Sequence, residues 1–83
     1  MKKIAVISAI LEEPGQAQQE FNSIVSSFKG IVKGRMGIPF EEEKIAVISL
    51  TIVGELNEIN SLTGKLGNIK DVSVKTAISK KEI

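Results

Sequence analysis

The chain has 83 residues with 11 basic and 10 acidic side chains, which gives a formal net charge of +1. This balance is too even to indicate binding to nucleic acid or to an anionic membrane through the overall field. The absence of cysteine and histidine excludes disulfide bonds, thiol chemistry, histidine-assisted nucleophiles and the common zinc sites.

The first segment, Lys3–Leu11, is nearly all apolar and rich in isoleucine and valine, which is typical of a strand covered on both faces. The opening residues also look like a secretory signal, in which lysines precede an apolar run. This run is short and β-branched, and Glu12, Glu13 and Pro14 follow it where a cleavage site needs small residues. No stretch reaches the roughly 20 apolar residues of a membrane span. We therefore expect a strand here, and a soluble, cytoplasmic protein with no membrane partner.

A helix and two strands are predicted next. Pro14 suits the first position of a helix, and the apolar residues that follow it lie on one helical face. These residues are Ala17, Phe21, Ile24, Val25 and Phe28. Gly30 ends the helix. We then expect a strand over Ile31–Ile38, a bend over Pro39–Glu43 and a strand over Lys44–Val53.

The last part of the chain predicts a second helix and a fourth strand. Leucine and isoleucine recur at helical spacing over Glu55–Leu66, and Glu58 suits the positive N-terminal end of this helix. Gly67 suits a left-handed cap. Apolar and polar residues alternate over Asp71–Ser79, as in a strand with one solvated face. We expect Lys80–Ile83 to be a frayed tail.

The order strand, helix, strand, strand, helix, strand is that of the ferredoxin-like βαββαβ fold. We therefore predict an α+β protein in which residues 1–83 form a single domain, with both helices on one face of a four-stranded antiparallel sheet. The first and third strands are central in this topology and are apolar on both faces. The second strand carries Lys33 and Arg35 on one face, and the fourth also has a polar face, which suits their places at the edges.

Two helices cover only one face of such a sheet, so the other face exposes apolar residues of the central strands. A domain of this length also buries only about 60 to 65% of the surface of its unfolded chain. Together these features predict a homo-oligomer with a two-fold interface on the helix-free face. The alternative is a monomer in which Ser8, Ser49 and Thr51 make that face sufficiently polar. The predicted interface residues are Ile4, Val6, Ile10, Ile45, Val47 and Val53.

Two segments look like functional sites but have simpler explanations, and we predict no catalytic residue and no metal site. Consecutive residues at a bend point in different directions, so we interpret the acidic cluster Glu41–Glu43 as turn residues. The segment LTGKLG, Leu62–Gly67, resembles a phosphate-binding loop, but it lacks serine or threonine after Lys65 and lies within a helix. A glycine inside a helix costs about 1 kcal/mol relative to alanine, so we expect Gly64 to pack closely on the sheet or on a neighbouring chain.

Arg35 and Gly37 are the remaining candidates for a binding site. On an edge strand and facing the helix-free side, Arg35 is suited to an ion pair between subunits or to a ligand carboxylate, which it binds with two hydrogen bonds. The alternative is a solvated charge that discourages aggregation of the edge strand.

The second half of the chain resembles a family of small proteins named as regulators of iron-only hydrogenase systems. The resemblance covers residues from about Arg35 to Thr76, and the preceding strand and helix match the family in pattern. The matching pieces are Arg35, Gly37 and Pro39 at the bend, Ile45–Leu50, Leu62, Gly64–Gly67 and Val72–Thr76. The family is similar in fold to ACT domains and to the metal-binding domain of nickel-responsive regulators, which agrees with the βαββαβ order. The nickel site itself is not implied, because its histidine and cysteine ligands are absent.

The resemblance implies a non-enzymatic regulator associated with an iron-only hydrogenase system, with a role in transcription and no cofactor. Its implied partners are further copies of itself, as a homodimer or tetramer, and a hydrogenase-related or DNA-binding protein. ACT-like domains also imply a small effector, such as an amino acid, near the first strand-to-helix loop, where this chain has Glu13, Gly15 and Gln16. The alternative is a transcriptional regulator that contacts DNA directly, which would give binding a steep dependence on salt.

Overall fold

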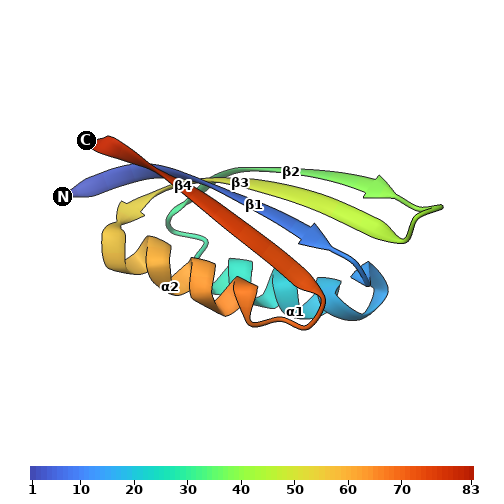
Figure 1. Ribbon diagram of the computed structural model, residues 1–83. Helices are drawn as coiled ribbons and strands as arrows, with labels where there is room; N and C mark the ends of the chain where they lie inside the picture. Colours follow the sequence, from blue (N-terminus) through green and yellow to red (C-terminus); the bar gives the residue numbers. More distant parts are fainter.

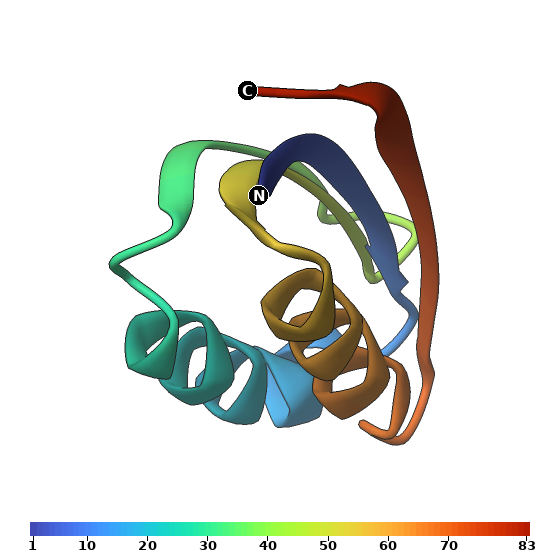
Figure 2. The same cartoon turned by 90° about the vertical axis from the view of Figure 1, so that its left-hand side faces the viewer.

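The computed structural model describes residues 1–83 as four strands and two helices in the order βαββαβ (Figure 1). The elements are β1 (Lys2–Leu11), α1 (Pro14–Ser27), β2 (Val32–Phe40), β3 (Ile45–Glu55), α2 (Leu56–Gly67) and β4 (Val72–Glu82). All pairings are antiparallel, and the strand order is β2-β3-β1-β4. Figure 2 shows that both helices lie on one side of the curved sheet. The predicted ferredoxin-like α+β fold, with β1 and β3 in the centre, is therefore confirmed.

The side chains of β1 alternate between the two faces of the sheet. One set faces the helices and is at most 1% exposed: Ala5, Ile7, Ala9 and Leu11. The set between them, Ile4, Val6 and Ile10, is 41 to 45% exposed and lies on the face without helices, called the open face from here on. Strand β3 follows the same alternation because each of its residues pairs with a residue of β1 that points to the same face.

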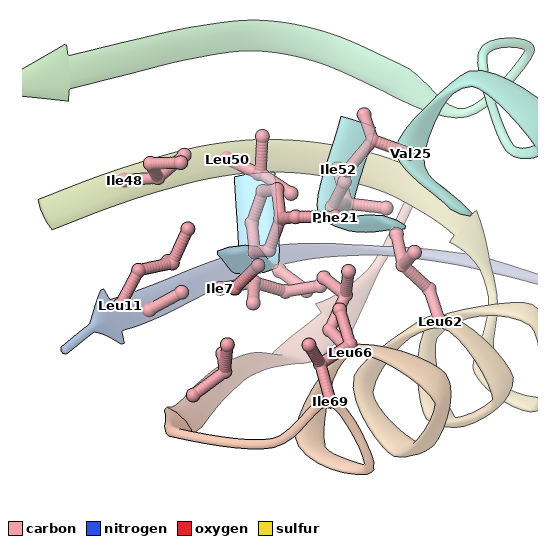
Figure 3. Close-up of a cluster of buried hydrophobic side chains, with 14 of the residues drawn as sticks. Ile7, Leu11, Phe21, Val25, Ile48, Leu50, Ile52, Leu62, Leu66 and Ile69 are labelled. Carbon is pink, nitrogen blue, oxygen red and sulfur yellow. The ribbon is translucent and has the colours of Figure 1, made fainter. Parts of the chain in front are cut away.

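The hydrophobic core lies between the sheet and the helices and contains 15 buried residues, with no buried polar side chain. Figure 3 shows side chains from strands and helices meeting in this layer. Helix α1 contributes Ala17, Phe21 and Val25, and α2 contributes Ile59, Leu62 and Leu66. Their spacing of three and four residues is what places them on one side of each helix. Neither helix has the length and hydrophobicity that a membrane-spanning helix requires.

The segment LTGKLG lies in α2 and connects this helix to its neighbours. The hydroxyls of Thr63 and of Thr76 on β4 are 2.8 Å apart and share a hydrogen bond. The ammonium nitrogen of Lys65 lies 5.4 Å from the centroid of the Phe28 ring near the end of α1, which is within the range of a cation–π contact. Thr63 and Lys65 therefore help to fix the position of α2 against the sheet and against α1.

Several predicted boundaries were wrong. Strand β2 continues through Pro39 to Phe40, which is possible because β2 is an edge strand and the missing N–H of proline does not break the sheet. Gly67 is not left-handed, since no glycine has a positive φ; the left-handed residue after α2 is Asp71, with φ 63°. The tail is not frayed: Lys80–Glu82 belong to β4, and the backbone N–H of Ile83 donates to the carbonyl of Lys2 at 2.8 Å.

Replacing Gly64 with alanine is expected to raise the free energy of unfolding by about 0.5–1 kcal/mol, because glycine loses more backbone freedom than alanine in a helix. Close packing on the sheet, which we predicted for this position, is absent: a Cβ at Gly64 would have no atom within 4 Å outside the helix backbone. Urea denaturation followed by far-ultraviolet circular dichroism measures the change. Gly54→Ala is the control, since its Cβ would lie 3.1 Å from Cγ2 of Ile31 and should give no such gain. A less stable Gly64→Ala variant would contradict this explanation.

Candidate functional site

A cleft lies between the β2–β3 hairpin and the beginning of α1. The molecule is elongated, with extents of 41 × 18 × 17 Å, and Figure 1 shows the hairpin reaching beyond the helices at one end. The cleft has a volume of 610 Å³ and is lined by 14 residues. The part near α1 consists of Glu13, Pro14, Gly15 and Gln18, and the hairpin supplies the remainder, between Arg35 and Ile48.

Arg35 is held against α1 by two contacts. Its Nη2 donates to Oδ1 of Asn22 at 2.6 Å, and its guanidinium carbon lies 5.7 Å from the centroid of the Phe21 ring. A guanidinium carries five N–H donors, and the hydrogen bond to Asn22 uses one of its two terminal amino groups. The side chain is therefore positioned within the cleft while retaining donors for a ligand.

Our prediction that Arg35 faces the helix-free side was wrong. Arg35 pairs with Leu50 of β3, whose side chain is fully buried on the helix side of the sheet. The reason is a β-bulge at the start of β2: Val32 pairs with Ile52, but Gly34 pairs with Thr51. One extra residue in a strand reverses the face to which every later side chain points.

The beginning of α1 places the backbone of Gly15, with its N–H group, at the cleft. Glu13 precedes the helix and makes no side-chain cap hydrogen bond, while its carbonyl accepts from the N–H groups of Gln16 and Ala17, both at 3.0 Å. Pro14 has no N–H, so Gly15 carries the first N–H of the helix, and such groups have no partner within a helix. A Cβ at Gly15 would have no neighbour within 4 Å. The backbone here is open to an approaching group, and the helix dipole favours a negative one.

Four of the five predicted ligand-binding residues line this cleft: Glu13, Gly15, Arg35 and Gly37. The fifth, Gln16, is exposed on α1 and does not line it. Sequence reasoning missed Lys44 and the apolar floor formed by Pro39, Ala46 and Ile48. No local signal identifies them, because the cavity exists only where the pairing of β2 with β3 extends beyond the beginning of α1.

The turn of the hairpin adds a further charged residue to the cleft. Residues Glu41–Lys44 form the turn, which confirms that the glutamate cluster is a bend, and the N–H of Lys44 donates to the carbonyl of Glu41 at 3.2 Å. Lys44 has φ 56°, a left-handed conformation that is uncommon for residues other than glycine, asparagine and aspartate. This turn places Lys44 and Glu41 in the cleft wall.

The cleft therefore combines two basic side chains, Arg35 and Lys44, with two acidic ones, Glu13 and Glu41, and an apolar floor. Its lining contains no serine, threonine, tyrosine, cysteine or histidine. No group of three or more potential metal ligands comes together in the molecule. The arrangement is suited to binding a small molecule with both charged and apolar parts.

The open face carries all six predicted interface residues: Ile4, Val6, Ile10, Ile45, Val47 and Val53. It also carries three apolar residues of β2 that sequence reasoning missed, Met36, Ile38 and Phe40, which are 45 to 63% exposed. The bulge that turns Arg35 toward the helices turns these three side chains away from them. The apolar surface is therefore larger than the sequence indicated.

Comparisons with known proteins agree with the fold and with the resemblance found in the sequence. A family model described as "TM1266-like: Iron-only hydrogenase system regulator, putative" matches residues 3–76. The chain is also similar to the solved structure of the uncharacterized protein TM1266 from Thermotoga maritima, with 31% sequence identity and a TM-score of 0.91. This similarity covers 96% of the present chain and 100% of TM1266.

A more distant likeness shows the fold alone. The structure of LarC2 in its apo form gives a TM-score of 0.51 with 15% sequence identity. LarC2 is the C-terminal domain of a cyclometallase involved in the synthesis of the NPN cofactor of lactate racemase. The match covers 96% of the present chain and 58% of the LarC2 chain. A comparison with curated protein sequences gives no match.

Proposed function

Because the chain belongs to the TM1266-like family of iron-only hydrogenase system regulators, we propose that it is a non-enzymatic module that senses a small effector. The effector binds in the cleft between the hairpin and α1, and its occupancy changes the interaction of the module with a partner in the hydrogenase system. The ligand class that best matches the lining is a small carboxylate with an apolar portion, such as an amino acid.

The placement of Arg35 is the observation that carries this proposal. An arginine that is already fixed by Asn22 and the Phe21 ring loses little conformational entropy when it binds a carboxylate, and it offers two parallel hydrogen bonds. The N–H of Gly15 and the positive end of α1 favour the same negative group. The volume of 610 Å³ also falls in the range of about 300–1,000 Å³ that is typical of small-molecule sites.

The other side chains of the cleft support a ligand with a second, positive group. Glu13 and Glu41 supply carboxylates suited to an amine, and the apolar floor suits an aliphatic or aromatic substituent. The lining offers charges, hydrogen-bond donors and apolar surface, but no nucleophile with an adjacent histidine base. These features support binding as the role of the cleft.

The test is isothermal titration calorimetry with the standard amino acids and their 2-oxo acid counterparts. We expect at least one to bind the wild type, and Arg35→Gln to weaken that binding by about 10-fold or more, because charged hydrogen bonds are lost. Lys33→Gln is the matched control: it removes a positive charge from the same strand, but Lys33 does not line the cleft. Equal binding by Arg35→Gln and the wild type would contradict the proposal, as would the absence of binding by every compound.

A further inference from the structure

The open face gathers most of the exposed large hydrophobic side chains of the molecule. Nine large hydrophobic residues are more than 40% exposed, and six of them lie on this face. The six are Ile4, Val6, Ile10, Met36, Ile38 and Phe40. Large contiguous apolar patches on a surface mark interaction sites, which makes this face a candidate interface.

A pair of serines at the centre of the open face separates two apolar clusters. Ser8 and Ser49 are directly paired at the centre, with Met36 beyond Ser49 and Lys75 beyond Ser8. The N-terminal cluster, on one side of this pair, consists of Ile4, Val6 and Val53. The hairpin cluster, on the other side, consists of Ile10, Ile38, Phe40, Ile45 and Val47. Short side chains between two apolar clusters allow another sheet to approach closely at the centre.

The two ends of the sheet differ in charge. The end where β1 begins carries four lysines and the N-terminal ammonium against three glutamates, Glu55, Glu58 and Glu82; the lysines are Lys2, Lys3, Lys80 and Lys81. The end where β1 finishes carries six acidic residues against two lysines. The acidic residues are Glu12, Glu13, Glu41–Glu43 and Asp71, and the lysines are Lys44 and Lys70.

We propose that the open face binds a second copy of the chain, with the two sheets face to face and running in opposite directions about a two-fold axis near Ser8 and Ser49. In this arrangement the N-terminal cluster of each copy packs on the hairpin cluster of the other. The basic end of each copy lies over the acidic end of its partner. A two-fold interface requires a surface that is complementary to itself. The apolar clusters of the open face meet this requirement, and the two ends of the sheet differ in charge in the sense that it needs.

The size of the open face is sufficient for such a dimer. Strands about 4.8 Å apart, each of about ten residues at roughly 3.3 Å per residue, give four strands a face of roughly 600 Å² in projection. Standard interfaces bury about 800 Å² of accessible surface per partner, and accessible surface exceeds projected area on a face with protruding side chains. Aligned sheets pack about 10 Å apart with their strands within about 30° of each other.

Single cysteines test the direction of packing, since the chain contains none of its own. In the proposed dimer Val53 of one copy lies opposite Ile45 of the other, across a gap of about 10 Å, whereas the two copies of Val53 are about 26 Å apart along the strand. A short bis-maleimide should therefore cross-link a mixture of Val53→Cys and Ile45→Cys proteins, one of them carrying a mass tag. Neither variant should cross-link with itself. Cross-linking of each variant with itself and not in the mixture would overturn the proposed direction.

Association itself is measured by sedimentation equilibrium between about 1 and 100 μM, without added ligand. We expect a dimer whose dissociation constant rises with salt, because the charged ends are exposed to screening. Val6→Lys should raise the dissociation constant by about 100-fold or more, since it places an unpaired charge in the interface. Asn60→Lys, on the exposed surface of α2, is the matched control and should leave it unchanged. A wild type that stays monomeric at every concentration would overturn the proposal, as would a dimer that Val6→Lys does not weaken. Neither result affects the proposed cleft, which the calorimetric titration tests by itself.

Discussion

Replacing Phe21 with alanine is expected to lower the free energy of unfolding by about 3–5 kcal/mol. Phe21 is fully buried and is among the largest side chains of the core. Its removal from α1 leaves a cavity beneath the sheet that the surrounding residues fill only in part. A domain of this size has a total stability on the order of 4–12 kcal/mol, so the variant should lose a large share of it.

Far-ultraviolet circular dichroism in urea is the appropriate measurement, because the chain has no tryptophan or tyrosine for fluorescence. Two variants serve as controls. Phe21→Leu retains most of the buried volume and should cost less than Phe21→Ala, while Phe28→Ala removes a half-buried ring at the edge of the core and should cost less as well. A loss below about 1 kcal/mol for Phe21→Ala would mean that the core collapses readily around the missing ring.

The second large effect is expected on β1, where two isoleucines three residues apart face opposite sides of the sheet. Ile7 is fully buried, whereas Ile10 is 45% exposed on the open face. Ile7→Ala should lower the free energy of unfolding by about 2–5 kcal/mol. Ile10→Ala makes the same chemical change, but in dilute solution it should cost less than half as much, because part of its side chain is already in water.

Thermal and urea unfolding at several protein concentrations compare the two variants. The loss in free energy of unfolding caused by Ile7→Ala should be the same at every protein concentration, because the residue lies inside one chain. With the open face as an interface, the loss in free energy of unfolding caused by Ile10→Ala should grow with protein concentration. Association stabilises the wild type by mass action, and the variant associates less. Equal deficits for the two variants in dilute solution would contradict the assignment of the two faces.

The order of the elements was predictable from sequence because each element carries its own periodicity. The apolar residues of α1 and α2 recur at helical spacing, and β1 and β3 are apolar on both faces as central strands must be. These patterns depend only on local sequence. The resemblance carried by Arg35–Thr76 is likewise local, and the family match over residues 3–76 confirms it.

The contacts of β2 were not predictable in the same way. The alternation of VKGRMGIPF indicates that polar and apolar residues face opposite sides, but not which side faces the helices. The bulge between Val32 and Gly34 decides this by shifting the pairing with β3. That single extra residue explains why Arg35 was assigned to the wrong face, and why Met36 and Ile38 were missed from the open face.

The cleft was predictable only in part for a related reason. Glu13 and Gly15 were implied by the resemblance to ACT-like domains, which points to the first strand-to-helix loop, and Arg35 and Gly37 were identified as residues on an edge strand. That these two groups meet depends on how far the hairpin extends beyond α1. The left-handed conformation of Lys44 also has no sequence signal, because lysine is not a residue that favours it.

The extension of the hairpin beyond the helices also separates residues that line the cleft from the residues that stabilise the fold. Glu41 and Lys44 are exposed and lie outside the core, where substitutions usually change stability by no more than about 0.5 kcal/mol. Related chains can therefore diverge at these positions while the layer around Phe21 stays the same. Arg35 is the exception, since its guanidinium contacts the ring of Phe21. A substitution of Arg35 should therefore change both the cleft and the packing at the edge of the core.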